Sequence, residues 1–526
     1  MRIDTVNPDI SNKEQIANNK QSTSNKMWTF ALLGLFLIRI FPFLSGNYLY
    51  DEAISLSVYV IQKDNIFQIF RDYSMANNHF LSNAIYWLWL AVIGKKGLIM
   101  ECLTRLPSLL CGIGSILIVL YHWRKFIGEK KAWLAALLIA LSPVYSGFAW
   151  QVRGYSLIFF LGIALVAESL HRLRQMTVWN GLTVFLLSLL LPLAMPSSVM
   201  LPAAVGAGMC VAYWIATRKV SSALRLVFPV FIGVFLGGGY YLTLGSQFWA
   251  SAKAAGGWDS FWKTIGNISL AIVFHCGIFS IGIPVLLWQA LQRILKAIRV
   301  RNIVPECDVL ELYPSLLALS VIAVILGLLL CSIPTSHYPF PRVFLLMLAP
   351  LTFTVMSTDT VLGKMSFWKQ IVLTVLLAVL LNAGCDLYVK YADSDYSRPC
   401  QNLLVQRWRG RGIFYDVASI ILAEYKETGE AVTLIDGNWV PSVGFYCQIY
   451  DLAWLKNRFK AVMDVEWLPR SYIELARQHG VKIKILSRSE EEARDILKKV
   501  SFDFQTSLSV RKQYGDYTYY VVNITP

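Results

Sequence analysis

The stretch Tyr48–Ala53, Tyr-Leu-Tyr-Asp-Glu-Ala, places two adjacent acids directly after the first long apolar run of the chain. Ionisable residues are rare and costly inside a bilayer, so Asp51 and Glu52 mark the point where the chain leaves the membrane. The ordinary interpretation of such a pair is a solvated loop or the start of a helix. The rest of the sequence indicates which side of the membrane the pair faces and which residues it meets there.

The composition of the chain is that of a polytopic membrane protein. Of its 526 residues, 56% are hydrophobic and 15% are charged, whereas about a quarter of the residues of soluble domains are charged. The net charge of +15 comes from basic residues in short clusters between apolar runs. That distribution follows the positive-inside rule, so we expect no nucleic acid partner. The nine cysteines show no metal-binding spacing, which disfavours a zinc site.

Eleven apolar runs are long enough to span a bilayer, at about 17–24 residues each. They fall at 28–44, 106–123, 132–149, 155–171, 180–196, 199–216, 224–242, 267–290, 314–333, 342–358 and 367–386. Every second connection is basic, beginning with Arg124, Lys125, Lys130 and Lys131. The charge rule therefore predicts a multi-pass protein of the inner or plasma membrane with a cytosolic N-terminus. An odd number of spans puts the C-terminal region outside the cytosol.

One further apolar segment, Phe80–Ile93, is short for a span and fits a helix that lies on the outer membrane surface. Counting it as a span would invert every later loop and place the basic loops outside. The first outer loop, 45–105, is then long and structured, and it is basic against the charge rule. Binding of an anionic ligand would explain the basic residues of this loop.

The sequence divides into three regions. Residues 1–26 are polar, show no cleavable-signal pattern and predict a disordered cytosolic tail. Residues 27–390 form the transmembrane domain, and residues 391–526 alternate strand and helix patterns, which predicts an extracytoplasmic α/β domain. The expected strands are Val432–Ile435, Val481–Leu486 and Tyr517–Asn523, and the expected helices are Val417–Lys426, Ser471–His479 and Glu490–Val500.

The role of this C-terminal domain stays open between acceptor docking and structural capping, because it contains no glycine-rich phosphate loop. Whether Cys400 and Cys447, which share this region, form a disulfide is likewise open. The sequence does not indicate an oligomeric state.

Four motifs follow the acidic pair in a distinctive order. They are Asn77-Asn78-His79, then Leu103–Ser108 (Leu-Thr-Arg-Leu-Pro-Ser), Leu141-Ser142-Pro143 and Gln151–Tyr155 (Gln-Val-Arg-Gly-Tyr). No single motif is specific, but in this order and on this face they resemble the GT-C glycosyltransferases, specifically the protein mannosyltransferase and aminoarabinose transferase-like membrane enzymes. The likeness is clearest over residues 28–175 and continues more weakly to about 358.

The resemblance implies a GT-C-like fold and an inverting transfer outside the cytosol. The donor would be a sugar on a polyprenyl phosphate, and the acceptor a hydroxyl of a lipid, glycan or protein. Because phosphate is a good leaving group, such a site needs a base for the acceptor proton and fixed positive charge for the phosphate. By resemblance, Asp51 would be that base, and Glu52 would orient the acceptor or a neighbouring cation.

The resemblance and the topology also suggest contacts to the donor phosphate. Arg153 and Tyr155 lie at the outer junction of the third and fourth spans and are the best-placed candidates. His79 and Arg342 are further candidates on the same face. Three more polar residues are candidates for sugar or acceptor contacts: Asn78, His337 and Tyr338.

Two positions depart from the family pattern. Many relatives carry two prolines after a Lys or His where this chain has His79-Phe80-Leu81, and many carry an acid where this chain has Val152. The first departure affects the placement of His79, because the two prolines that would follow it in relatives are missing. The second removes a metal-binding carboxylate, which argues against a strict need for a metal. We therefore expect no required cofactor. A divalent metal is possible, but no motif in the sequence supports one.

Two other classes of function remain open at this stage. A transporter or flippase of a lipid-linked sugar predicts ionisable residues at mid-span depth and inverted repeats, and the sequence shows no internal repeat. A non-catalytic membrane scaffold that displays the C-terminal domain is the second. The identity of the sugar and of the acceptor does not follow from the sequence.

Overall fold

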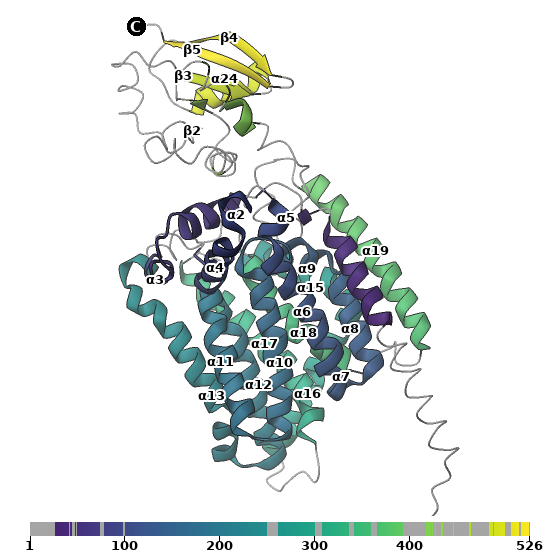
Figure 1. The fold of residues 1–526 in the computed structure, drawn as a ribbon. Helices are drawn as coiled ribbons and strands as arrows, with labels where there is room; N and C mark the ends of the chain where they lie inside the picture. The colour runs from purple at the N-terminus through teal and green to yellow at the C-terminus, as the bar shows by residue number, and fades with distance from the viewer. Residues whose placement is uncertain are drawn as a thin grey trace, which may run out of the picture.

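The structure is a computed structural model in which helices form a bundle and a small sheet lies near the C-terminus (Figure 1). It describes residues 27–41, 43–44, 48, 50–73, 78–97, 100–249, 261–299, 308–335, 341–358 and 365–392 of the helical part. Toward the C-terminus it describes 417–421, 423, 427, 433–434, 445, 462–463, 483–487, 489–499, 506–514 and 517–524.

Seven helical runs in the described residues are long and apolar enough to cross a membrane. They are Leu106–Ile127, Gly154–Arg174, Pro196–Thr217, Val220–Leu244, Phe261–Arg299, Val309–Ser332 and Phe367–Gly384. Four shorter apolar helices accompany them: Met27–Phe41, Phe80–Gly94, Val178–Ala194 and Val343–Ser357. The predicted fold class, a polytopic α-helical membrane protein, is confirmed, whereas the number of eleven spans stays a prediction.

The third expected span, 132–149, is not continuous. The chain forms α8 (Glu129–Leu141) and then a separate α9 (Pro143–Phe148). Proline has no N–H to donate, and the Ser142 hydroxyl accepts a hydrogen bond from the backbone N–H of Tyr145 at 3.1 Å, so a new helix begins here. The apolar run 132–149 therefore contains two helices, and the span predicted there stays a prediction.

The expected span 267–290 is also interrupted. It forms α15 (Phe261–Cys276), a 3₁₀ turn and α16 (Gly282–Arg299), with Gly277 at φ 56° between them. The buried His275, at the end of α15, bonds Ser142 Oγ at 2.7 Å and Thr352 Oγ1 at 2.8 Å. One imidazole thus ties together both interrupted segments and α18 (Leu348–Ser357).

Helix α10 (Gly154–Arg174) is the centre of the bundle, and most of its residues are buried. It packs against α6 (Leu106–Ile118), α11 (Val178–Ala194), α12 (Met200–Thr217) and α18. Because neighbours on all sides hold it, the residues at its two ends are held in fixed places. Its N-terminal end carries Arg153, and its C-terminal end carries Arg174.

Short elements gather at the end of the bundle where α10 begins (Figure 1). They are α2 (Tyr50–Ile54), a π-helical turn (Ser55–Ile61), α3 (Ile66–Arg71), α4 (Phe80–Gly97) and α5 (Glu101–Thr104). In α4 the regular helix stops at Gly94, whose φ is 67°. This position at the end of the bundle fits the surface helix that the sequence predicts, and the orientation relative to a membrane stays a prediction.

The C-terminal region forms a five-stranded sheet in the order β2-β1-β3-β5-β4, parallel for β2, β1 and β3 and antiparallel beyond. Its elements are β1 (Thr433–Leu434), β2 (Val462–Met463), β3 (Ile483–Ser487), α24 (Glu490–Lys499), β4 (Thr506–Tyr514) and β5 (Tyr517–Ile524). Three strands and α24 occur where the sequence predicts them. The sequence missed β2 and β4, and in β4 the charged residues Arg511 and Lys512 resemble a loop. The helix expected at Ser471–His479, and Cys400 and Cys447, lie outside the described residues.

This region packs directly on the acidic-pair segment. Phe445 meets Tyr48 edge-to-face, with ring centroids 5.0 Å apart. Val417, Ile421 and Tyr519 share the same buried cluster with residues of α2 and α4. The contact fits the capping role that the sequence left open.

Candidate active site

Asp51 lies in the first turn of α2 and is only 5% exposed. Its carboxylate forms an ion pair with the Arg153 guanidinium, and Arg153 is 2% exposed. Arg153 is the extended residue that caps the start of α10, with φ −151° and ψ 170°. The pair therefore joins the acidic loop to the N-terminal end of the central helix, as the predicted topology requires.

His79 is the second partner of Arg153. Its Nε2 lies 3.0 Å from Arg153 Nη2, and because a guanidinium can only donate, Nε2 must accept. In this contact the ring proton therefore lies on Nδ1. The Arg153 guanidinium also lies over the Tyr155 ring, 5.1 Å from its centroid, and the His79 and Tyr155 rings meet edge-on at 5.6 Å.

Gly154 permits this arrangement. A Cβ built at position 154 would lie 2.6 Å from His79 Nδ1 and 3.1 Å from the carbonyl oxygen of Ala194. No side chain fits between the start of α10 and the imidazole. This lack of space explains why a glycine occupies the fourth position of the Gln-Val-Arg-Gly-Tyr motif.

The four residues Asp51, His79, Arg153 and Tyr155 form one cluster, which we call the Asp51 cluster. It combines a carboxylate, an imidazole and a guanidinium at the positive end of a 21-residue helix. A phosphate is attracted by such an end and by a guanidinium, and a carboxylate beside it can accept a proton. The sequence predicted all four residues, and the structure brings them together.

Glu52 points to a different partner. Its Oε1 and Oε2 accept from Arg105 Nε at 3.2 Å and Arg105 Nη2 at 2.8 Å, and both side chains are 0% exposed. Oε1 also accepts the backbone N–H of Val152 at 2.7 Å. Glu52 thus orients a neighbouring cation and holds the turn that presents Arg153, which is one of the two roles that the sequence suggested.

Arg105 is enclosed on every side. Its Nη1 donates to the backbone oxygens of Phe43 at 3.1 Å and Leu44 at 3.0 Å, and its guanidinium lies over the rings of Tyr48 and Trp150. Burial raises the pKa of the Tyr48 phenol well above its usual range, so Tyr48 is neutral beside this ion pair. The sequence analysis identified the Leu-Thr-Arg motif but not Glu52 as the partner of its arginine.

A hydroxyl network fixes the turn before α10. The Ser108 hydroxyl bonds the carbonyl oxygen of Gln151 and the Tyr86 hydroxyl, each at 2.5 Å. The Ser156 hydroxyl donates to the carbonyl oxygen of Ser108 at 2.7 Å. Ser108 and Gln151 were identified from the sequence only as members of motifs. These contacts show that both residues fix the backbone that precedes α10.

Other predicted contacts fare differently. The Asn78 carboxamide donates to the backbone oxygens of Ile69 and Asp72 and accepts from Asn83 Nδ2. The Asn78 amide thus holds α3 to α4, and the acceptor or sugar contact predicted for it stays a prediction. His337 and Tyr338 lie outside the described residues, as does the side chain of Arg342.

One group of described residues could hold a metal ion, and it lies far from Asp51. His122, Glu168 and His171 offer ligand atoms that are all within 4.8 Å of one another. Glu168 and His171 belong to the last two turns of α10, whereas Arg153 precedes its first turn. This group therefore cannot serve chemistry at Asp51.

Comparisons with known proteins identify the fold. No family model and no curated protein sequence matches the chain. A crystal structure of ArnT, an aminoarabinose transferase, from Cupriavidus metallidurans in the apo state superposes with a TM-score of 0.54 at 13% identity, covering 95% of this chain and 98% of that one. The same protein bound to undecaprenyl phosphate gives 0.55 at 14% identity, covering 94% and 98%.

A structure of the Archaeoglobus fulgidus oligosaccharyltransferase gives a TM-score of 0.45 at 13% identity, over 87% of this chain and 67% of that one, which is too low to carry an argument. The ArnT structures alone confirm the predicted GT-C fold. Their identity to this chain is low, so the chemistry must be argued from the Asp51 cluster.

Proposed function

We propose that this chain, which has the fold of the GT-C membrane glycosyltransferases, transfers a sugar from a polyprenyl-phosphate donor to an acceptor hydroxyl on the extracytoplasmic face of the membrane. The observation that carries the proposal is the buried contact of Asp51 with Arg153, and of Arg153 with His79, at the start of α10. An ArnT of the same fold binds undecaprenyl phosphate, which supports the class of donor.

The reaction is a single displacement with inversion. The acceptor oxygen attacks the anomeric carbon and loses its proton to the Asp51 carboxylate. The bond between the anomeric carbon and the phosphate oxygen breaks, and its electron pair leaves with the polyprenyl phosphate. The two new bonds and the two broken bonds balance, so no oxidant, reductant or further reactant is needed.

Arg153 would link donor binding to the base. Its guanidinium contacts both Asp51 and His79. An incoming phosphate competes for the same N–H donors, because Arg binds phosphate as readily as carboxylate. A phosphate that takes the guanidinium leaves the Asp51 carboxylate to the acceptor hydroxyl.

Glu52 has no direct part in this mechanism. It positions Arg105 and the turn before α10, so it acts through the backbone that presents Arg153. We assign no step to a metal ion, since the Asp51 cluster has one carboxylate and one imidazole and both contact a cationic side chain.

The experiment uses the purified full chain in vesicles with radiolabelled undecaprenyl-phosphate sugars, a hexose and an aminopentose, and envelope extract from a deletion strain as the acceptor source. We expect a covalently labelled product with the wild type and none with Asp51→Asn. Mass spectrometry of envelope glycans from the deletion strain then identifies the acceptor that lost its sugar.

Two outcomes would reject the proposal. Unchanged transfer by a folded Asp51→Asn variant would remove Asp51 from the mechanism. Movement of the labelled lipid across the vesicle membrane without a covalent product would favour the transporter that the sequence left open.

A further inference from the structure

A cavity of about 950 Å³ lies at the end of the bundle opposite to the Asp51 cluster. Leu170 and Arg174, in the last turns of α10, line it, whereas Arg153 precedes the first turn. A helix of 21 residues is about 30 Å long, so the two sites are about one bilayer core apart. The remaining walls come from α7 (Arg124–Ile127), α8, α16, α17 (Val309–Ser332) and α18.

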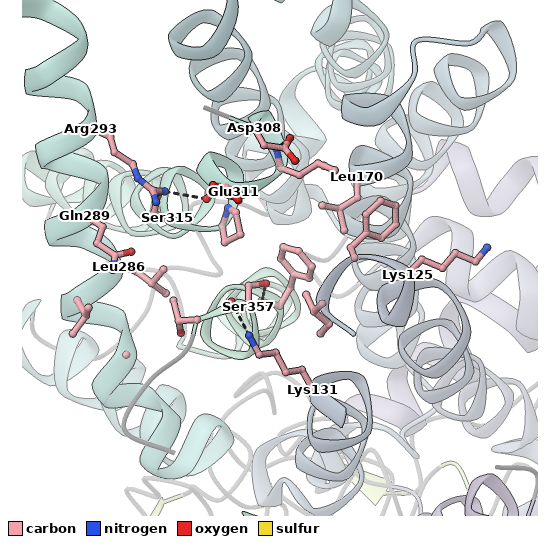
Figure 2. Close-up of a pocket in the computed structure, with 18 of the residues that line it drawn as sticks. Lys125, Lys131, Leu170, Leu286, Gln289, Arg293, Asp308, Glu311, Ser315 and Ser357 are labelled. Atoms are coloured by element: carbon pink, nitrogen blue, oxygen red, sulfur yellow. Dashed lines mark hydrogen bonds between the residues drawn. The ribbon is translucent and has the colours of Figure 1, made fainter. Parts of the chain in front are cut away.

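Two cations project into this cavity from facing walls (Figure 2). Arg293 of α16 donates from Nη1 to the Glu311 carbonyl oxygen at 3.0 Å and the Ser315 hydroxyl at 2.9 Å. Lys131 of α8 donates from Nζ to the carbonyl oxygen of Ser357 at 3.3 Å. These hydrogen bonds to backbone and hydroxyl oxygens order both head groups at the cavity wall.

The lining carries more positive than negative charge. Among the described residues that line the cavity, four are basic (Lys125, Lys131, Arg174 and Arg293) and two are acidic (Asp308 and Glu311). Asp308 is engaged at the start of α17, where its carboxylate accepts the backbone N–H of Leu310 at 2.9 Å. The 24-residue α17 also directs its positive end to the cavity. This excess of positive charge favours an anionic ligand.

The residues of α16 that line the cavity form a stripe that changes in polarity along the helix, which indicates a ligand with a polar and an apolar part. Ile281, at the turn before the helix, and then Val285, Gln289 and Arg293 follow at four-residue spacing, and all four line the cavity. Ile281 is 63% exposed and Val285 48% exposed, so the apolar half of the stripe also forms part of the outer surface of the bundle. Over about 18 Å the side chains of this stripe change from aliphatic groups to an amide and then to a guanidinium.

We propose that this cavity binds a phospholipid with an anionic, phosphate-bearing headgroup. The phosphate lies between Lys131 and Arg293, Gln289 contacts the polar glycerol part, and an acyl chain follows Val285 and Ile281 out to the lipid. Basic pockets between transmembrane helices bind such headgroups. The positive-inside rule alone explains basic residues at this end of the bundle, but it does not explain two cations ordered inside a cavity next to an apolar stripe.

The test measures retained lipid and is independent of chemistry at Asp51. The full chain is purified from vesicles containing equal parts of phosphatidylglycerol and phosphatidylcholine, and native mass spectrometry counts the bound lipids. We expect the wild type to retain phosphatidylglycerol selectively. Lys131→Gln and Arg293→Gln should each reduce that retention about fivefold, as about 1 kcal/mol per cation implies.

The chain offers matched controls for both variants. Lys130 neighbours Lys131 on α8, and Lys296 lies one turn beyond Arg293 on α16; both are exposed, and neither lines the cavity. Lys130→Gln and Lys296→Gln therefore change the charge of the same surface equally and should keep the bound lipid. Gel filtration and melting of each variant confirm that it is folded.

Three results would overturn the proposal. An equal loss in the matched controls would mean that surface charge alone attracts the lipid. Equal retention of phosphatidylcholine would mean that the headgroup is not recognised. Displacement of the lipid by millimolar glycerol phosphate or inorganic phosphate would mean that the site takes its phosphate from water and that the apolar stripe contributes nothing.

Discussion

Asp51 and Glu52 are neighbours in the sequence, and each forms a buried ion pair with an arginine, but the two pairs are built differently. The partners of Arg105 are a carboxylate and two backbone carbonyl oxygens, and two aromatic rings cover it. The partners of Arg153 are a carboxylate and the ring of His79, at the positive end of α10. An anion near Arg105 would meet carbonyl oxygens, whereas an anion near Arg153 would meet an imidazole and a helix end.

The comparison teaches that burial and pairing alone do not identify a catalytic acid. Both carboxylates are less than a tenth exposed. The two carboxylates differ in whether the arginine that each one contacts can also bind a substrate. Arg153 can exchange its contacts for a phosphate, and Arg105 cannot do so without leaving backbone oxygens and Glu52 unsatisfied in the interior.

The largest expected effect is that of Asp51→Asn on transfer. Loss of a general base typically costs 10²–10⁴-fold, so we expect about a 10³-fold lower rate per folded molecule. The assay is label transfer in vesicles, normalised to the folded fraction from gel filtration. If the rate per folded molecule falls less than about tenfold, Asp51 is not the base, and the contrast between the two acids fails.

The second prediction concerns the stability of the Glu52 pair. Glu52→Gln leaves the Arg105 charge buried without its carboxylate, and such changes cost about 3–5 kcal/mol. We expect a lower melting temperature and a lower folded yield, while the molecules that fold keep most of their transfer activity. Melting in detergent, followed by gel filtration, measures both.

A double variant controls for this interpretation. Glu52→Leu combined with Arg105→Met removes both charges, and an apolar pair of similar volume often restores much of the lost stability. A double variant that is no more stable than Glu52→Gln would show that the Glu52 pair holds the fold through its hydrogen bonds to Val152 and to the backbone of Phe43.

The sequence predicted the residues of the Asp51 cluster better than it predicted their partners. Charge alternation and motif order place Asp51, His79 and Arg153 at one end of the bundle, because they depend only on which spans end there. Which acid meets which arginine depends on the rotation of α2 and of the turn at Gln151–Arg153, and periodicity cannot give that rotation. The breaks at Ser142 and Gly277 were missed for a related reason, since an apolar run looks continuous whether or not its helix is.

The third prediction separates charge from geometry at Arg153. Arg153→Lys keeps the positive charge but loses the planar fork that contacts Asp51 and His79 together. We expect the KM for the donor to rise about tenfold, as loss of one charge-assisted hydrogen bond implies. The same change at position 105 should lower stability and leave the donor KM unchanged. If both lysine variants raised the donor KM equally, the distinction between the two arginines would be lost.

The smallest expected effect tests the close contact between α10 and His79. Gly154→Ala puts a methyl group 2.6 Å from His79 Nδ1, so the imidazole must move and its contact with Arg153 lengthens. Alanine also favours the start of a helix, so the net loss of stability should be only about 1 kcal/mol. Gly147→Ala is the matched control, because a Cβ there meets nothing within 4 Å. Since only the first variant displaces His79, a fall in donor affinity confined to Gly154→Ala would place His79 beside the phosphate. An equal response of the two variants would reduce His79 to a packing residue and leave Arg153 as the phosphate contact.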